Sequence, residues 1–299
     1  MQRSCRRFAN QFDQTITGDM MFKKNNVVYI CGGNEIASAT AVRLHNSGFE
    51  IVCVVNENEN NLRYHLCIGD AIFQGQKILE NVTAATIDES LWGITEGEDR
   101  PSKIHQALQY LLKDRKIAVI PQADLAFAMD ALPPDVIVNF YSENYSPITI
   151  DDAHLVIGAF PLHQPGTNCH IAVETRETYH IGRYYTPNCH IPEAINDPFF
   201  KQPFDWCKSP IGGVWVSLKN IGDMVHYNEA IGRVDSIEIR SPFDGQIWGL
   251  THSGKIIEAR AAVAQIFQHT PSDAFRYFGY REQAISGGVL EALLHFAMD

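Results

Sequence analysis

Short apolar runs alternate with amphipathic segments through the first half of the chain. Residues 26–31 and 50–55 are each typical of a buried parallel strand, and apolar positions at helical spacing follow the glycine pair between them. This order predicts a βαβ unit with a right-handed crossover. The alternation continues with helical patterns at 101–113 and 125–132 and with strand-like runs at 71–73, 117–120 and 135–138. We therefore expect a doubly wound, Rossmann-like α/β domain.

An internal repeat marks the second half of the chain. Thirty-two residues separate the segment that starts at Ser209 from a similar one at Ser241, and both contain a Ser-Pro pair and a tryptophan. Each copy runs into a turn with a glycine and then into a short apolar strand. Two similar halves of a small all-β unit explain this period. The chain closes with the apolar segment 287–296, for which we expect a helix starting at the glycine pair.

These patterns divide the chain of 299 residues into parts. A soft prior of about 150 residues per domain already suggests two domains. We expect an N-terminal extension at 1–24, the Rossmann-like domain at 25–155, a loop-rich central segment at 156–205, an all-β domain at 206–270 and a C-terminal segment with a helix at 271–299.

The composition and charge limit the classes of partner that we expect. The net charge is −11, which argues against nucleic acid or an anionic membrane surface, since both reward clustered Lys and Arg. No apolar run approaches the length of a membrane span. Seven cysteines are too few and odd in number for a disulfide scaffold. We therefore expect a cytoplasmic protein with reduced thiols and no nucleic-acid or membrane partner. Assembly into a homo-oligomer stays open.

The first candidate site is the turn after the first strand. Gly32, Gly33, Asn34 and Glu35 stand where backbone N–H groups at a helix N-terminus hold a phosphate. Glu57 follows the second strand, where an acid can bind a ribose hydroxyl. These five residues, together with Arg183, are the cofactor-binding candidates. The alternative is a plain strand–helix turn with a surface acid.

The second candidate site lies in the central segment. His170 and Glu174 are four apart on a predicted strand, so their side chains share a face and are candidates for acid–base catalysis. Arg183 is a candidate for binding an anionic group. The alternatives are a structural hydrogen-bonded pair and a surface ion pair. The Asn-Cys-His-Ile phrase at 168–171 recurs at 188–191, but adjacent strand residues point to opposite faces, so we expect no metal site.

The repeat resembles the two halves of a biotinyl/lipoyl-like barrel-sandwich domain. Segments 219–226 and 240–245 look like its hairpins. In carrier members a lysine bears the prosthetic group just before the second hairpin, whereas Arg233–Arg240 contains no lysine. The resemblance therefore implies a structural or docking unit with no biotin or lipoate attached.

The order of blocks along the whole chain carries a wider resemblance. The glycine turn is followed in order by phrases at Arg43–Phe49, Asp152–Gly158, His170–Thr175, Ile181–Arg183, Pro187–Pro192 and Ile285–Ala292. Over about 27–296 the chain is similar to the selenium-dependent molybdenum hydroxylase system protein family, which is related in role to xanthine dehydrogenase accessory proteins. The first turn, Gly-Gly-Asn-Glu, departs from that family's Gly-x-Gly-Asp.

This resemblance implies a maturation factor for molybdenum-dependent hydroxylases. The ligand would be a molybdopterin nucleotide or another nucleotide, held by the glycine turn and the His170 face. The partner would be the hydroxylase or one of its maturation proteins. Two other readings stay open at this point: a nucleotide-dependent oxidoreductase, and a degenerate scaffold that binds only protein.

Overall fold

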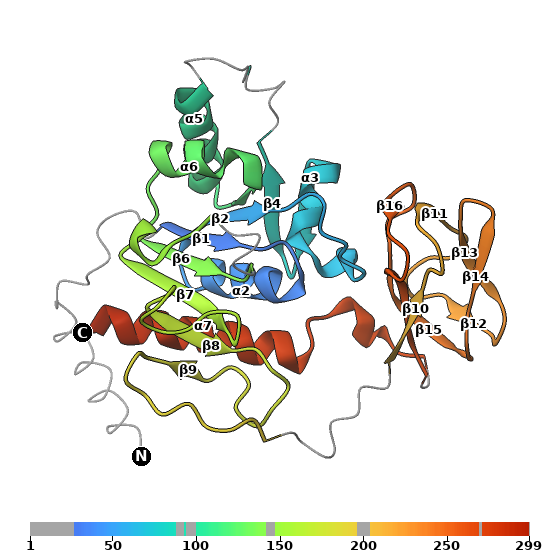
Figure 1. Ribbon diagram of the computed structural model, residues 1–299. Helices are drawn as coiled ribbons and strands as arrows, with labels where there is room; N and C mark the ends of the chain where they lie inside the picture. The colour runs from blue at the N-terminus through green and yellow to red at the C-terminus, as the bar shows by residue number, and fades with distance from the viewer. Residues whose placement is uncertain are drawn as a thin grey trace, which may run out of the picture.

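The computed structural model describes residues 27–87, 93, 100–141, 147–195, 204–268 and 271–298. The predicted extension at 1–24 lies outside these residues. A large sheet with helices on both faces occupies one end of the molecule, and a unit built only of strands occupies the other (Figure 1). No helix in the described ranges is long and apolar enough to span a bilayer.

The large sheet is mixed and has nine strands in the order β3-β4-β5-β2-β1-β6-β7-β8-β9. From β4 to β8 all neighbours are parallel, and the edge strands β3 and β9 pair antiparallel. Buried parallel strands read as continuous apolar runs, and β1 is buried at every position. The strands are β1 (Val27–Cys31), β2 (Glu50–Val55), β3 (Gln76–Leu79), β4 (Val82–Thr86), β5 (Ile117–Pro121), β6 (Val136–Asn139), β7 (Leu155–Phe160), β8 (Ile171–Glu174) and β9 (Tyr184–Tyr185).

Helices cover both faces of this sheet. On one face, α2 (Glu35–Asn46) and α7 (Tyr280–Met298) share an apolar cluster with Val28 and Ile30 of β1. On the other face, α5 (Arg100–Lys113) and α6 (Leu125–Ala131) pack against Tyr29 and its neighbours. Alternate residues of one strand thus enter different cores, as the pleat requires.

The last helix differs from the prediction. α7 begins at Tyr280, so the glycine pair lies inside the helix instead of starting it. A Cβ at Gly288 would lie 1.8 Å from the carbonyl oxygen of Gly182. The glycine is therefore required for contact between α7 and the loop before β9. The predicted strand at 71–73 is also wrong, because Ala71–Gln74 forms the short helix α3.

The second unit consists of two four-stranded sheets around one apolar core. Their orders are β10-β17-β15-β12 and β14-β13-β11-β16. The internal repeat is confirmed, since β11–β13 and β15–β17 follow each other at matching intervals and β12 and β16 cross to the other copy's sheet. The strands are β10 (Phe204–Lys208), β11 (Gly213–Ser217), β12 (Met224–Val225), β13 (Ala230–Val234), β14 (Ile237–Arg240), β15 (Gly245–Leu250), β16 (Ile256–Ile257) and β17 (Ala262–Phe267).

The predicted fold class, a Rossmann-like domain joined to a biotinyl/lipoyl-like barrel-sandwich domain, is wrong. The sheet does not end near residue 155 but continues through β7, β8 and β9 to Tyr185, and α7 returns from the far end of the chain to cover it. The central segment expected to be mostly loop therefore supplies sheet strands. One mixed nine-stranded sheet with an attached all-β unit replaces the predicted arrangement.

Candidate binding site

The glycine turn between β1 and α2 is closed by packing. The Gly33 carbonyl accepts a hydrogen bond from the Gly69 N–H at 3.3 Å. A Cβ at Gly33 would lie 2.8 Å from Cγ1 of Val55 and 3.3 Å from Cα of Gly69. Asn34 caps α2, with Oδ1 accepting from the Ala37 N–H at 3.1 Å. The glycines here allow neighbouring chain to pack closely against the turn. The turn therefore does not form an open cradle for a phosphate.

An internal carboxyl occupies the position expected for a phosphate. Glu59 accepts hydrogen bonds from Asn61, the Gly33 N–H and Asn34. Burial raises the pKa of Glu59, and these hydrogen bonds only partly offset it. Its Oε2 is buried and makes no hydrogen bond with any described residue. Because helix N-termini favour negative charge, this carboxyl competes with any phosphate for the same place.

A cavity of about 680 Å³ opens beside this turn, and we call it the helix-terminus cavity. The starts of α2 and α7 contribute Glu35 and Arg281 to its wall, and the chain before Tyr64 contributes Arg63. The all-β unit contributes Trp248 of β15 and Gln265 of β17. The cavity therefore exists only where four distant parts of the chain meet.

Two arginines and their acids set the charge of this cavity. Arg63 Nε lies 4.0 Å from Oε1 of Glu35, and Arg281 Nε lies 3.7 Å from Oε1 of Glu177. Both Nε atoms are buried without a hydrogen bond to a described residue, although Nη2 of Arg63 donates to the Tyr277 carbonyl at 3.2 Å. Burial raises the pKa of Glu35, which its own N–H and Arg63 counteract. The two guanidinium groups are thus held near acids but keep donor capacity.

Aromatic and amide groups complete the wall. Trp248 packs its ring 4.4 Å from Phe267, and the Arg63 guanidinium lies 6.0 Å from the indole. Gln265 is only 6% exposed, and its Oε1 has no hydrogen-bond partner in the described part of the chain. Of the two repeat tryptophans, Trp215 packs in the core of the all-β unit, whereas Trp248 lines the cavity. Indole, guanidinium and amide together suit a planar heterocycle with polar edges.

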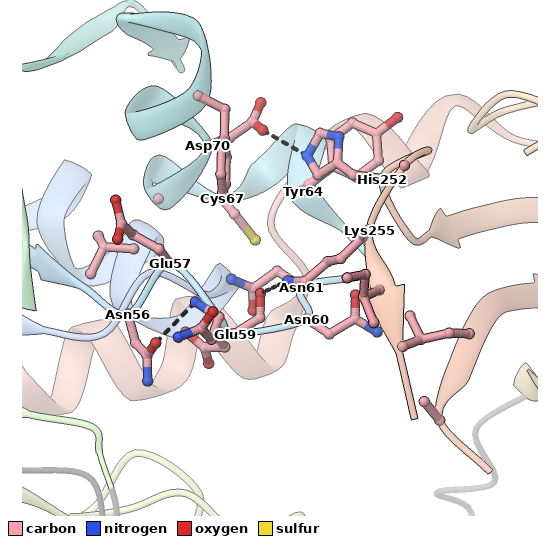
Figure 2. A pocket seen from close by; sticks show the side chains of 18 of the residues that line it. Asn56, Glu57, Glu59, Asn60, Asn61, Tyr64, Cys67, Asp70, His252 and Lys255 are labelled. Atoms are coloured by element: carbon pink, nitrogen blue, oxygen red, sulfur yellow. Dashed lines mark hydrogen bonds and ion pairs between the residues drawn. The ribbon is translucent and has the colours of Figure 1, made fainter. Parts of the chain in front are cut away.

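A second cavity, of about 870 Å³, is lined by the segment Asn56–Asn61, and we call it the post-β2 cavity. Figure 2 shows Glu57, Glu59, Asp70, His252 and Lys255 around it. Asp70 accepts from His252 Nε2 at 2.8 Å and from Lys77 Nζ at 2.7 Å, which ties the sheet to the all-β unit. Glu57, expected at a ribose, is an exposed lining residue here.

The predicted acid–base pair does not come together. Nδ1 of His170 accepts from the Val156 N–H at 3.0 Å, at the start of β8. Glu174 is fully buried at the other end of β8, about 13 Å away along an extended strand. It binds Arg176 through two nitrogen atoms at 2.9 and 2.6 Å. The two side chains therefore have separate structural partners.

Arg183 belongs to neither cavity described above. It is exposed and lines a third cavity of about 1000 Å³ with Tyr179 and Cys189. Of the predicted cofactor residues, only Asn34 and Glu35 line the helix-terminus cavity. The sequence reasoning missed Arg63, Arg281, Trp248 and Gln265 as a group. No local motif joins them, because each comes from a different part of the chain.

Comparison with known proteins gives a relative but no family. No family model matches the chain. The uncharacterized protein YqeB of Escherichia coli (strain K12) is 26% identical over 296 residues, covering 95% of this chain and 51% of YqeB. The chain thus spans about half the length of the curated relative it matches.

The solved structures with some likeness carry other names. An aspartoacylase family protein from Mesorhizobium loti has a TM-score of 0.24 at 11% identity, covering 83% of this chain and 87% of its own. A succinylglutamate desuccinylase/aspartoacylase family protein from Shewanella amazonensis has a TM-score of 0.23 at 8% identity, covering 82% and 91%. TM-scores this low do not establish a shared fold. These neighbours carry the names of aspartoacylase and desuccinylase family proteins, and neither is named as a Rossmann-like, barrel-sandwich or molybdenum hydroxylase accessory protein.

Proposed function

We propose that the protein binds a planar, anionic heterocycle in the helix-terminus cavity and takes part in the maturation of molybdenum-dependent hydroxylases. One observation carries the binding proposal: the buried Nε atoms of Arg63 and Arg281 lack hydrogen bonds to described residues, in a cavity with Trp248 in its wall. The order of sequence blocks supports the process. The ligand would be a molybdopterin nucleotide or a related nucleotide, carried as cargo.

Each side chain has a distinct task in this proposal. Trp248 offers an aromatic face for stacking, and its place against Phe267 fixes that face. Arg63 and Arg281 supply guanidinium donors for phosphate or carbonyl oxygens. Glu35 and the Oε1 of Gln265 accept from ring N–H groups. A ligand with an anionic tail and donor and acceptor edges satisfies all of these groups at once.

The glycine turn does not support a nucleotide-dependent oxidoreductase. That reading needs a cofactor pyrophosphate at Gly33, where Glu59 already accepts the backbone N–H. A phosphate there would meet both Glu59 and the half-buried Glu35. The protein-binding scaffold remains as the other alternative, and it differs from our proposal by predicting no small-molecule binding. A client hydroxylase or one of its maturation proteins is the partner that the proposal requires.

Titration calorimetry with neopterin, guanosine 5′-monophosphate and cytidine 5′-monophosphate tests the binding proposal. We expect at least one of these probes to bind, and Arg63→Gln and Arg281→Gln each to weaken that binding about tenfold or more, since hydrogen bonds to charged groups contribute about 1.5–3 kcal/mol. Arg183→Gln is the matched control, because Arg183 lines a different cavity. It should leave the affinity unchanged.

Two results would count against the proposal. If none of the three probes binds to the wild-type protein, the scaffold reading is favoured. If Arg183→Gln weakens binding as much as Arg63→Gln does, the ligand occupies another cavity. Thermal unfolding of each variant without ligand shows whether lost binding reflects lost folding. With ligand, the melting temperature should rise only for proteins that bind it, because a ligand selective for the native state stabilises that state.

A further inference from the structure

The wall of the helix-terminus cavity contains a deeply buried acid, Glu282. It lies in the first turn of α7, lines the cavity and is only 6% exposed. Its side chain makes no hydrogen bond or ion pair with any residue that the structure describes. Neither of its oxygens is fully enclosed, in contrast to Oε2 of Glu59, so the carboxylate keeps access to the cavity. A buried carboxylate without a donor is costly, and a ligand that donates to it would remove that cost.

Helix capping does not account for this acid. A glutamate in the first turn can reach back to the backbone N–H before the helix, which here belongs to Gly279. A Cβ at Gly279 would lie 2.8 Å from Oε2 of Glu282, so the carboxylate lies beside this residue. No hydrogen bond joins these two described residues, however. The helix dipole favours the negative charge of Glu282 but leaves its oxygens free to accept from a ligand.

The all-β unit supplies a second acceptor to the same cavity. Gln265 of β17 is also 6% exposed, and its Oε1 is buried with no partner among the described residues. A phosphate has only acceptor oxygens when it is ionised, so it satisfies neither Glu282 nor Gln265 and is repelled by the carboxylate. The ligand therefore presents N–H groups to these two side chains. Its anionic part belongs near Arg63 and Arg281, which supply donors.

We propose that Glu282 recognises the edge that pterin and guanine rings share, in which an amino group, a ring N–H and a carbonyl stand side by side. This inference rests on the proposed function and specifies which ring enters the cavity. The amino group and the ring N–H point the same way, so the two oxygens of one carboxylate accept from both. The neighbouring carbonyl oxygen accepts from a guanidinium N–H of Arg63 or Arg281.

The same geometry discriminates against other rings. Cytosine and adenine carry an unprotonated ring nitrogen beside the amino group, and its lone pair would face the carboxylate of Glu282. Hypoxanthine has the ring N–H and the carbonyl but lacks the amino group, so it makes one of the two hydrogen bonds. A cationic ligand would satisfy the carboxylate but would be repelled by the two arginines that line the cavity. A neutral ring with two adjacent N–H donors fits best.

Titration calorimetry of the full-length protein with guanosine 5′-monophosphate and inosine 5′-monophosphate tests this inference, since the two differ only in the amino group. We expect the wild type to bind the guanosine nucleotide about tenfold more tightly or better, because a hydrogen bond to a charged group is lost with inosine. In Glu282→Gln this preference should fall to about threefold or less, because an amide binds an N–H group less strongly than a carboxylate does. Glu291→Gln is the matched control and should keep the preference, since Glu291 is an exposed residue of α7 that lines the third cavity.

The ratio of the two affinities separates recognition from a structural role, because a damaged helix start would weaken both nucleotides alike. Equal affinity of the wild type for both nucleotides would overturn the inference while leaving the cavity as a binding site. An unchanged ratio in Glu282→Gln would overturn the role of Glu282. If the wild type binds neither nucleotide nor neopterin, the proposed binding function fails and this inference fails with it. The wild-type ratio needs no variant, so it decides the question even if Glu282→Gln does not fold.

Discussion

The glycine pair inside α7 allows a matched test of the packing between this helix and the sheet. We consider alanine at each position in turn. A Cβ at Gly288 would meet the Gly182 carbonyl oxygen at 1.8 Å, its carbonyl carbon at 2.7 Å and Cγ1 of Val173 at 3.1 Å. At Gly287 the nearest atom is Nη1 of Arg43 at 3.8 Å, at the end of a flexible side chain. Neighbouring substitutions of identical chemistry thus meet opposite environments.

The magnitudes follow from this geometry. Alanine stabilises a helix interior by roughly 0.5–1 kcal/mol relative to glycine, and Gly287→Ala should gain about that much. Gly288→Ala makes the same gain, but ordinary contact begins at 3.4 Å, so α7 and the Gly182 loop must separate by roughly 1.5 Å. Overpacking typically costs about 1–3 kcal/mol, and this contact is with backbone. We expect a net loss of about 2 kcal/mol or more.

Urea denaturation followed by circular dichroism measures both effects. Gly287→Ala should leave the midpoint unchanged or raise it, and Gly288→Ala should lower it clearly. In thermal unfolding, about 2–4 °C per kcal/mol applies to chains of 150–250 residues, so we expect Gly288→Ala to melt about 5 °C or more below the wild type. If both variants are equally stable, the close approach of α7 to Gly182 is refuted.

Two further predictions concern the segment after β2. Asp70→Asn should cost about 3 kcal/mol, because it removes one partner of a buried charge cluster with Lys77 and His252, which urea denaturation measures. Burial alone raises the pKa of Asp70, but the hydrogen bonds from His252 and Lys77 outweigh it and lower the pKa. In the wild type this stabilisation should be fully present above a pH of about 4, and it should be lost as the pH falls through the lowered native pKa of Asp70. The Asp70→Asn variant should not show this loss, which would identify Asp70 as its source. Glu59→Ala removes the acceptor for the Gly33 N–H, so added formate should raise its melting temperature more than that of the wild type; equal shifts would contradict the internal-anion assignment.

Local patterns predicted those elements whose burial depends on near neighbours. The apolar runs of β1 and β2 and the amphipathic pattern of α5 each appear where we expected them. The thirty-two-residue repeat was visible because both copies form the same strands. In these cases the residues of the segment itself, or of its second copy, carry the signal.

The sheet boundary and the start of α7 could not be predicted in the same way. The strands β8 and β9 are short, and their membership of the sheet depends on pairing with β7, which their own residues do not reveal. From the sequence alone, the glycine pair at 287–288 suggested the start of a helix. The structure instead explains Gly288 by its tertiary contact with Gly182, which joins segments about a hundred residues apart.

The candidate site shows the same limit. Asn34 and Glu35 were placed correctly at the start of a helix, but their expected phosphate seat is filled by Glu59, whose position depends on the turn after β2. His170 and Glu174 lie near the ends of one strand, but their partners come from β7 and from the residues after β8. Spacing on a strand gives the face of a side chain and not its partner.

The central claim is that the helix-terminus cavity holds a pterin nucleotide, and native mass spectrometry tests it most directly. The protein would be purified anaerobically from molybdate-fed cells of its own host, as wild type, as the Arg63→Gln/Arg281→Gln double variant and as Arg183→Gln. We predict a retained mass matching a pterin nucleotide in the wild type and in Arg183→Gln, and its loss in the folded double variant. A bare wild-type chain, or a retained mass that survives in the double variant, would contradict the account.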